Sequence, residues 1–408
     1  MTATTTVKDA LKSIGSAVLR TPTIYSPILS EQTGAEVWLK LENLQITGSF
    51  KVRGAYIKLM GLQPDQRKAG VVAASAGNHA QGVAYHASKL GIPATIVMPE
   101  TTPFTKVART EALGATVLMY GESFSEAVTK AYELVEKNNL TFIPPYDDPD
   151  IYLGQGSLML EFIEDAPELD AVVVPIGGGG LISGCCLAIR EANAKTAVFG
   201  VQSALYPSMI EAMAKIPSTS GGRTIAEGIA VKTPGNLTKP IIEENVETIF
   251  KADEAAIEIA VHTLLTEQHL VAEGAGAASL AALLENKSKF KGKRVGLVIS
   301  GGNIDSRTLS AVLMRGLVRQ GRLARLRIEI PDTPGSLSKA TGVIGANNGN
   351  IIEIHHRRLF HNVPIKLTEV DVVVETVDDR QLEQIISVLN EAGFPTGILK
   401  GTSGADPG

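Results

Sequence analysis

A single lysine near the start of the chain has neighbours that make it a candidate for chemistry. Lys51 follows Phe50 in the stretch QITGSFKVRGA, residues 45–55. A lysine held in a cleft beside an aromatic ring can form a Schiff base with an aldehyde cofactor. An exposed basic turn is the alternative, because most lysines are solvated and Arg53 follows two positions later.

A run of four glycines is the second candidate: Gly177, Gly178, Gly179 and Gly180. It follows the apolar run 171–176 and precedes the helical pattern 181–192. Backbone N–H groups at a helix N-terminus bind phosphate, although a tight turn also favours glycine. Dinucleotide spacing would need glycine in place of Ile182, and no Gly-Lys-Ser or Gly-Lys-Thr follows for ATP. A small cofactor with one phosphate fits better.

Two further polar loops also follow apolar runs. One is Ser75-Ala76-Gly77-Asn78-His79, and the other is Ser300-Gly301-Gly302-Asn303. Successive N–H groups from Ser75 to Ala80 would meet a substrate carboxylate at a helix start. Asn78 and His79 can instead be a simple helix cap, and a lone histidine is more often structural. We therefore assign no proton transfer to His79.

The elements around these loops predict an α/β fold. Apolar, β-branched runs that alternate with helical stretches indicate buried parallel strands, here 71–74, 94–98, 171–176, 198–201 and 295–299. Ligands of open α/β sheets bind at the carboxyl ends of the strands. Since the three loops all follow such strands, we expect them to share one cleft.

Nine stretches in this order resemble the β-family (fold type II) of pyridoxal-phosphate enzymes, and most closely the threonine dehydratases, or threonine ammonia-lyases. They are LENLQITGSFKVRGA, SAGNHAQGVA, PPYDDP, GQGS, VVVPIGGGGLISG, EGI, TPGN, EGAGAA and SGGNID. The resemblance spans about residues 11–317. It implies a tryptophan synthase β-like catalytic domain, 1–320, built of two open twisted α/β subdomains, with the smaller one, about 52–150, inserted in the larger.

The resemblance also implies how pyridoxal 5'-phosphate is held. Lys51 would bond to it covalently and later act as the base at the substrate's α-carbon. Phe50 would pack on the pyridine ring, and Asn78 would bond the ring's 3-hydroxyl. Ser300 would meet the pyridine nitrogen, where a neutral hydroxyl does not keep that nitrogen protonated. The phosphate would lie on Gly177, Gly178, Gly179 and Gly180, and the substrate carboxylate on Ser75, Ala76, Gly77, Asn78 and His79.

The implied reaction is α,β-elimination of L-threonine to 2-oxobutanoate and ammonia, with L-serine to pyruvate as a second reaction. Racemases of the family need another acid–base group, and their loop resembles Ser-Ser-Gly-Asn. Ala76 cannot move protons, although Ser75 precedes it. The alternatives are another β-hydroxy amino acid as substrate, a β-replacement reaction, or a non-catalytic amino-acid sensor.

After about Gly316 the pattern changes, through an arginine-rich arm (315–327), to the order βαββαβ. We expect strands near 326–330, 350–360, 365–377 and Ile398, with helices at 336–346 and 378–392. This order resembles an ACT domain, a small-ligand regulatory module, over 325–402, followed by a tail, 403–408. The resemblance implies that isoleucine or valine binds at Asp332, Pro334, Gly335, Leu337, Asn350 and Ile351. A purely structural role in oligomerisation is the alternative.

Composition narrows the partners. A net charge of -5 does not favour nucleic acid. The adjacent Cys185 and Cys186 cannot form a disulfide that links distant parts of the chain. No apolar run is long enough to cross a bilayer. We expect a cytoplasmic homodimer or homotetramer. Glu273 either contacts the cofactor edge or a neighbouring loop, or is a solvated or capping carboxylate. Relatives often bind a cation near the stretch that matches Glu227, where several have aspartate. The sequence therefore leaves undecided whether this chain has a metal site.

Overall fold

A computed structural model of the chain describes residues 5–357 and 364–399. The last residues of the expected strand 350–360 and the predicted tail, 403–408, lie outside these ranges. The chain divides into two compact units, Met1–Asp305 and Ser306–Gly408. All residues singled out above for cofactor and substrate belong to the first unit.

A six-stranded sheet forms the larger part of the first unit. Its order is β1-β2-β10-β7-β8-β9, and the strands are parallel except for β1, which is antiparallel to β2. Their bounds are β1 Thr23–Ser26, β2 Glu36–Leu41, β7 Ala171–Pro175, β8 Ala197–Ser203, β9 Val246–Ala252 and β10 Arg294–Ile299. Because β7 and β10 are parallel neighbours, the glycine run and the Ser300 loop leave the sheet side by side.

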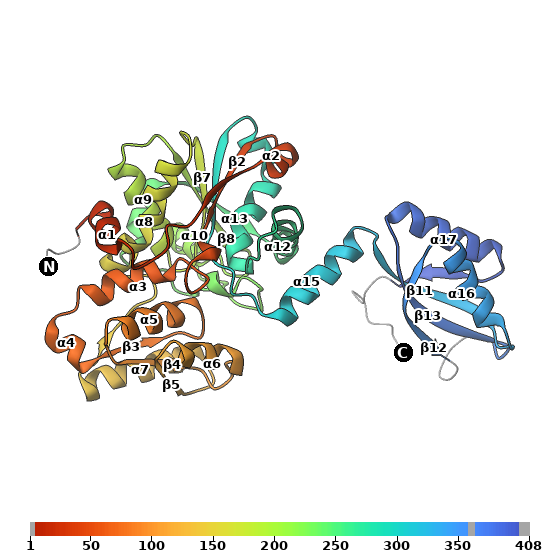
Figure 1. Cartoon of the computed structure of the whole chain (residues 1–408), viewed down its shortest axis with the longest axis horizontal. Helices are drawn as coiled ribbons and strands as arrows, with labels where there is room; N and C mark the ends of the chain where they lie inside the picture. Colours follow the sequence, from red (N-terminus) through yellow and green to blue (C-terminus); the bar gives the residue numbers. More distant parts are fainter. Residues whose placement is uncertain (1–4, 358–363, 400–408) are drawn as a thin grey trace. The chain divides into compact units, whose positions relative to one another are not determined.

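Helices cover both faces of this sheet. Figure 1 shows α8 and α9 on one face, with α12 and α13 on the other. Alternation along β7 explains this arrangement, since Val172 and Val174 enter the same core cluster as residues of α1, α8 and α9. The helices of this part are α1 Val7–Ile14, α2 Pro27–Thr33, α8 Pro149–Asp165, α9 Gly180–Glu191, α10 Ser208–Ala214, α11 Thr238–Asn245, α12 Glu254–Gln268, α13 Gly274–Glu285 and α14 Lys287–Phe290, with 3-10 turns η1 Glu42–Leu44 and η2 Glu227–Ile229.

The chain between β2 and β7 builds a smaller parallel sheet in the order β5-β4-β3-β6. Its strands are β3 Val71–Ala74, β4 Ala94–Met98, β5 Thr116–Met119 and β6 Thr141–Phe142. Its helices are α3 Lys51–Met60, α4 Pro64–Ala69, α5 Asn78–Lys89, α6 Phe104–Ala112 and α7 Phe124–Asn138. One face packs against α3 and α5, and the other packs against α7.

The predicted α/β fold is confirmed, and each of the five apolar runs is a strand. The sequence did not predict five further strands of these two sheets: β1, β2, β5, β6 and β9. They are short, partly exposed or interrupted by charge; β2, for example, contains the fully buried Lys40. Pairing with neighbouring strands, rather than local pattern, makes these segments extended.

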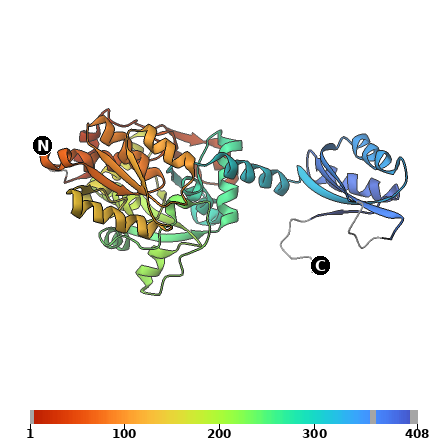
Figure 2. The ribbon, with the colours of Figure 1, turned by 90° about the horizontal axis from the view of Figure 1, so that it is seen from below.

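The second unit contains the predicted βαββαβ order. The strands are β11 Leu323–Pro331, β12 Asn350–Arg357, β13 Leu367–Glu375 and β14 Thr396–Ile398, and the helices are α16 Ser336–Ala346 and α17 Asp379–Glu391. The sheet is antiparallel in the order β12-β13-β11-β14, and both helices lie on one face of it (Figure 2). The arginine-rich arm, 315–327, is divided between the end of a helix, α15 Ser306–Arg319, and the start of β11.

Across the residues that the structure describes, no helix is both long and apolar enough to span a bilayer.

Candidate active site

Lys51 is the first residue of α3, and its amine is engaged inside the first unit. Lys51 Nζ donates a hydrogen bond to Pro145 O at 2.7 Å and lies 5.2 Å from the centroid of the Phe50 ring. The segment is tied to the loop after β10, because Phe50 N donates to Ser300 O at 3.1 Å. The amine is therefore held between α3 and the loop after β6, so Lys51 is not an exposed basic turn.

Two groups in this region have shifted pKa values. Burial lowers the pKa of Lys51 to about 8, and the nearby Glu273 carboxylate opposes that shift. Burial likewise raises the pKa of Glu273 to about 7, against its hydrogen bond from Asn78. A lysine with a lowered pKa has more of the neutral, nucleophilic amine near neutral pH. Such shifts cluster at functional sites, although structural ion pairs cause them too.

The glycine run forms the turn from β7 into α9, and its backbone has no room for side chains. A Cβ atom on Gly178 would lie 2.3 Å from the Tyr146 ring. Gly179 has a φ of 99°, and a Cβ there would lie 2.6 Å from Oγ1 of Thr238. Because its four residues carry no side chains of their own, their backbone N–H groups can approach an anion at the start of α9, where an anion is favoured. These residues fit a phosphate.

Pro145 and Tyr146 connect the lysine to this turn. Pro145 O accepts the hydrogen bond from Lys51 Nζ, and the next residue, Tyr146, packs directly on Gly178. Tyr146 is itself held by the hydrogen bond that its hydroxyl donates to Thr233 O at 2.9 Å. The amine and the anion site therefore share one wall, as a cofactor with an aldehyde and a phosphate requires.

The loop from Ser75 to His79 joins β3 to α5. Ser75 Oγ accepts hydrogen bonds from Gly77 N at 3.2 Å and Ala80 N at 3.3 Å. A Cβ on Gly77 would meet no atom within 4 Å, so space is open there. Helix α5 lies against α3, since a Cβ on Gly82 would be 3.2 Å from the carbonyl carbon of Lys51. The loop thus reaches the helix that carries the lysine.

Asn78 links three loops of the site. Its Nδ2 donates to Glu273 Oε1 at 2.6 Å, and its Oδ1 accepts from Asn303 Nδ2 at 2.8 Å. Glu273 stands directly before α13, and Asn303 stands in the loop after β10. Of the two interpretations of Glu273, contact with a neighbouring loop is confirmed, because its carboxylate accepts from Asn78.

Ser300 and His79 are both buried. Ser300 Oγ donates to Ala275 O at 3.4 Å, a long hydrogen bond that leaves the hydroxyl little constrained. His79 Nε2 lies 2.9 Å from Ile143 O, which requires the proton on that nitrogen, and Nδ1 has no partner among the described residues. Burial, with a smaller effect from Lys51, lowers the pKa of His79 to about 3, so the ring is neutral at physiological pH.

The residues predicted to bind an effector fall into two groups within the second unit. Asp332, Pro334, Gly335 and Leu337 surround the turn from β11 into α16. Asn350 and Ile351 begin β12, where they pair with Glu375 and Val374 at the far end of β13. The turn follows Pro331, which pairs with Leu367 at the opposite end of that strand. Eight residues of strand separate the two ends by about 26 Å, so one chain does not bring the two groups together.

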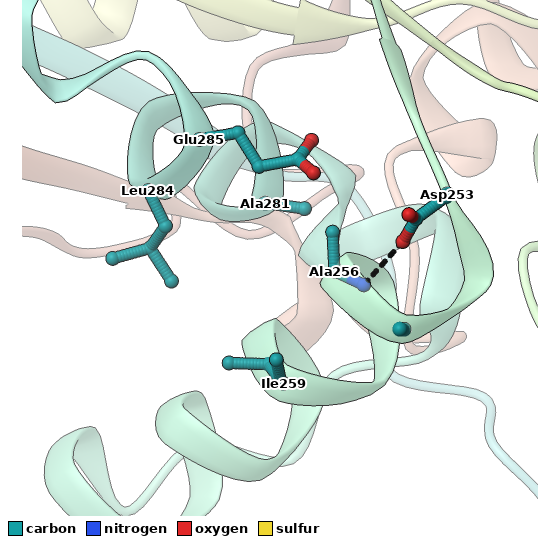
Figure 3. A pocket seen from close by; sticks show the side chains of 7 residues that line it. Asp253, Ala256, Ile259, Ala281, Leu284 and Glu285 are labelled. Atoms are coloured by element: carbon teal, nitrogen blue, oxygen red, sulfur yellow. Dashed lines mark hydrogen bonds between the residues drawn. The ribbon is translucent and has the colours of Figure 1, made fainter.

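A hollow of the first unit lies elsewhere, between α12 and the end of α13. It has a volume of about 300 Å³ and is lined by Asp253, Ala255, Ala256, Ile259, Ala281, Leu284 and Glu285 (Figure 3). Glu285 ends the helix that Glu273 precedes, and 12 residues of helix span about 18 Å. Asp253 also caps α12 by accepting from Ala256 N at 2.7 Å. None of the predicted site residues lines this hollow.

Some residues of the site had no predicted role, although their stretches were noted. Pro145 and Tyr146 lie in PPYDDP, and Asn303 lies in SGGNID. Thr238, which donates to Gly178 O at 2.7 Å, had no signal at all. Among the described residues, no group of three or more His, Cys, Asp or Glu side chains could hold a metal ion. Glu227 instead pairs with Lys106 of α6 at 2.5 Å.

Comparison with known proteins identifies the class. Residues 14–301 match the family of pyridoxal-phosphate dependent enzymes, and residues 324–394 match the ACT domain. The first match covers more than half of the chain, which therefore belongs to the pyridoxal-phosphate dependent enzymes and carries a C-terminal ACT domain. Both families predicted from sequence resemblance are confirmed.

Individual proteins of this family are similar to the chain over most of its length. An L-threonine ammonia-lyase of Thermotoga maritima is 44% identical over 395 residues, which cover 96% of this chain and 98% of that protein. The solved structure of threonine deaminase isoform 2 from Solanum lycopersicum has a TM-score of 0.71 and 33% identity, covering 76% of this chain and 92% of that one. Serine racemase from Dictyostelium discoideum has a TM-score of 0.69 and 33% identity, covering 73% and 97%.

Proposed function

We propose that this protein is a pyridoxal-phosphate-dependent threonine ammonia-lyase. It eliminates water from L-threonine, and the enamine released becomes an imine that water hydrolyses to 2-oxobutanoate and ammonia. It converts L-serine to pyruvate and ammonia in the same way. The observation that carries this proposal is the Lys51 amine, bonded to Pro145 O beside the glycine turn on which Tyr146 packs. The 44% identity to an L-threonine ammonia-lyase over nearly the whole chain supports the substrate.

Each residue near the amine has a role in this proposal. When bound, pyridoxal phosphate supplies an electron sink for the carbanion formed at the substrate's α-carbon. Lys51 attaches the cofactor, and its freed amine moves the α-proton. Phe50 packs on the cofactor ring, Asn78 donates to the ring oxygen, and Ser300 meets the ring nitrogen as a neutral partner. The N–H groups of Gly177, Gly178, Gly179 and Gly180 hold the phosphate.

The loop from Ser75 to His79 binds the substrate carboxylate in this proposal. Its N–H groups lie at the start of α5, where partial positive charge favours an anion, and Gly77 leaves open space in front of them. Ser75 Oγ already accepts two N–H groups of this loop, which holds the loop in shape. His79 stays neutral and supports the loop through Ile143 O.

Elimination is favoured over racemisation by the side chain at position 76. A racemase must deliver a proton to the second face of the substrate, and that requires a titratable group there. Ala76 offers only a methyl group. The similarity to a serine racemase therefore supports the shared fold and cofactor, while the residue at this position favours the lyase reaction.

A substrate panel tests the proposal. Threonine, serine and other β-hydroxy amino acids are offered to the cofactor-loaded enzyme, and 2-oxo acid and ammonia are measured together. We expect threonine to be the best substrate, the enzyme to be yellow, and Lys51→Ala to lose both the colour and the turnover. A colourless wild-type protein that binds amino acids without product would favour a non-catalytic sensor.

We further propose that the second unit regulates the enzyme by binding a branched amino acid at the turn that holds Asp332, Pro334, Gly335 and Leu337. Asn350 and Ile351 could complete that site only from a second copy of the chain, because of their distance from the turn in one chain. Calorimetry with isoleucine and valine, combined with kinetics, tests this. Absence of heat together with unchanged kinetics would contradict it.

A cytoplasmic homodimer or homotetramer completes the proposal. Leu44, Ile46 and Val271 are exposed apolar side chains, and the first and last belong to adjoining segments, since Asn43 Nδ2 donates to Val271 O at 3.0 Å. Exposed apolar groups that gather in this way suit a contact between copies. Cys185 and Cys186 are both unpaired and buried, as is common in reducing compartments. Light scattering at several concentrations measures the oligomer size.

A further inference from the structure

A row of side-chain hydrogen bonds crosses the candidate site from Thr47 to Glu273. Asn303 Nδ2 donates to Thr47 O at 2.7 Å and to Asn78 Oδ1 at 2.8 Å. Asn78 Nδ2 then donates to Glu273 Oε1 at 2.6 Å. The Thr47 carbonyl accepts and never donates, so Asn303 turns its amide nitrogen toward it. Because that nitrogen also donates to Asn78, Asn78 turns its oxygen toward Asn303 and its nitrogen toward Glu273.

Two glycines let the backbone close on this row. Gly48 has a φ of 71°, and a Cβ there would lie 2.6 Å from Asn303 Oδ1. A Cβ on Gly301 would lie 2.5 Å from Glu273 Oε1 and 3.3 Å from Asn78 Nδ2. Backbone thus packs against both ends of the row, which limits the movement of its side chains.

We propose that Glu273 and Asn303 are positioning residues, which orient the Asn78 amide so that it offers the cofactor a donor and not an acceptor. The inference rests on the proposed function. Asn78 Nδ2 carries two hydrogens, and Glu273 takes one of them. The amide oxygen is engaged by Asn303. The second N–H is then available to the ring oxygen of pyridoxal phosphate, an acceptor that an inverted amide would repel.

Charge alone does not account for this arrangement. The charged groups whose fields reach Glu273 are Lys51, Lys106 and Glu227, and none of them contributes a hydrogen bond to the row. A carboxylate that acted only as a counter-charge to Lys51 would need no alignment with an amide. The hydrogen bonds at 2.6 and 2.8 Å indicate orientation of Asn78 as the function of its neighbours.

The test compares Glu273→Ala, Glu273→Gln and Asn303→Asp with the wild-type protein. Each is prepared free of cofactor, and binding of added pyridoxal phosphate is measured by equilibrium dialysis and by the absorbance of the bound cofactor across pH. We expect Glu273→Ala to bind about tenfold more weakly, as the loss of a charge-assisted hydrogen bond implies. Asn303→Asp should lose at least as much affinity for pyridoxal phosphate, because its carboxylate would face two acceptors, Thr47 O and Asn78 Oδ1.

Glu273→Gln is the conservative variant, because its amide oxygen can still accept from Asn78. It should bind the cofactor within about threefold of wild type and keep the pH midpoint of the cofactor absorbance closer to the wild-type value than Glu273→Ala does. Glu285→Gln, at the far end of α13, removes a carboxylate from the same helix without touching the row, and we expect unchanged binding. A merely structural role would shift the urea midpoint of the variants but not the absorbance profile.

Two results separate the possible failures. If the wild-type protein binds pyridoxal phosphate with a visible band that Lys51→Ala lacks, but Glu273→Ala and Asn303→Asp bind it within twofold of wild type, the positioning inference is overturned and the proposed function stands. If the wild-type protein forms no band at all, the proposed function itself fails. Circular dichroism identifies a variant that does not fold, and the other variant then decides the inference.

Discussion

At the scale of single residues, the site holds two ionisable groups whose charged forms are disfavoured. Burial lowers the pKa of Lys51 to about 8 and raises that of Glu273 to about 7. A neutral amine is useful for chemistry, but burying an ammonium group reduces stability. The cofactor-free protein should therefore become more stable when the lysine is replaced by an apolar side chain of similar length.

We expect Lys51→Met to raise the free energy of unfolding of the cofactor-free protein at pH 7 by about 1 kcal/mol, after loss of the hydrogen bond to Pro145 O is deducted. Between pH 8 and pH 10.5 the unfolded wild-type chain binds more protons at this lysine than the folded chain, so wild-type stability rises with pH there. The variant should lack that rise. Urea unfolding at pH 7 and pH 10 measures both effects.

Lys58→Met is the matched control on the same helix. Lys58 forms ion pairs with Asp148 at 2.7 Å and Asp150 at 3.3 Å, and its pKa is raised by them despite its burial. Its replacement should lower stability instead of raising it. Equal effects of the two variants would contradict the view that Lys51 is destabilised by burial.

At the scale of elements, the turn between β7 and α9 depends on the absence of side chains. Gly178→Ala would place a methyl group against the Tyr146 ring, which is 2.3 Å from the ideal Cβ position. We expect a loss of about 1–3 kcal/mol of stability and much weaker binding of pyridoxal phosphate. Urea unfolding and cofactor titration measure the two.

Gly342→Ala provides the comparison for that variant. Gly342 lies within α16, and a Cβ there would meet no atom within 4 Å. Alanine favours a helix more than glycine does, so we expect a gain of up to about 1 kcal/mol. If Gly178→Ala were as stable as wild type and bound pyridoxal phosphate equally well, the proposed clash with the Tyr146 ring would be refuted.

A buried ionic cluster fixes the elements around the lysine. Arg53 of α3 pairs with Glu42 of η1 and Glu161 of α8, both at 2.8 Å, and Lys40 of β2 also pairs with Glu161 at 2.8 Å. All four side chains are buried. The cluster joins four elements two residues from Lys51, so its integrity bears directly on where the amine lies.

Glu161→Gln should destabilise the protein by about 3–5 kcal/mol, because it removes the carboxylate that the buried Lys40 and Arg53 share. Arg20→Ala, which breaks solvent-accessible pairs with Glu164 and Asp165, should cost at most about 1 kcal/mol. Urea unfolding of both variants tests the contrast. Similar losses in the two would show that burial does not set the strength of these pairs.

At the scale of the whole molecule, two buried histidines predict sensitivity to acid. Burial lowers the pKa of His79 to about 3 and that of His86 to about 4. Each histidine stays neutral in the folded chain at pH values where it gains a proton in the unfolded chain. Protons therefore bind the unfolded state preferentially below pH 6.5, and stability falls as the pH falls through that value.

His86→Phe isolates this effect, because His86 packs against the rings of Tyr56 and Tyr85 and its Nε2 has no partner among the described residues. From pH 8 to pH 5 the wild-type protein should lose about 2 kcal/mol through this residue. The variant should lose correspondingly less over the same range. Unfolding curves at the two pH values check this, and parallel losses in both proteins would contradict it.

Much of the molecule could be predicted from local sequence. Strands such as 71–74 and 94–98 could be predicted, because a short continuous apolar run between turns is typical of a buried strand. The glycine turn could also be predicted as a phosphate-binding turn, because it stands after a strand and directly before a helix. Strand β2 could not be predicted in this way, since charged residues interrupt its apolar pattern.

The sequence by itself determined the family, the most apolar strands and the βαββαβ order of the second unit, and it singled out the amine as a candidate. These features reside in short stretches whose residues are neighbours along the chain. Tertiary structure alone decided what surrounds that amine. The bond from Lys51 to Pro145 spans 94 positions, and the one from Asn78 to Glu273 spans 195. Desolvation shifts the pKa values only when such distant segments pack together, so no local pattern could encode them.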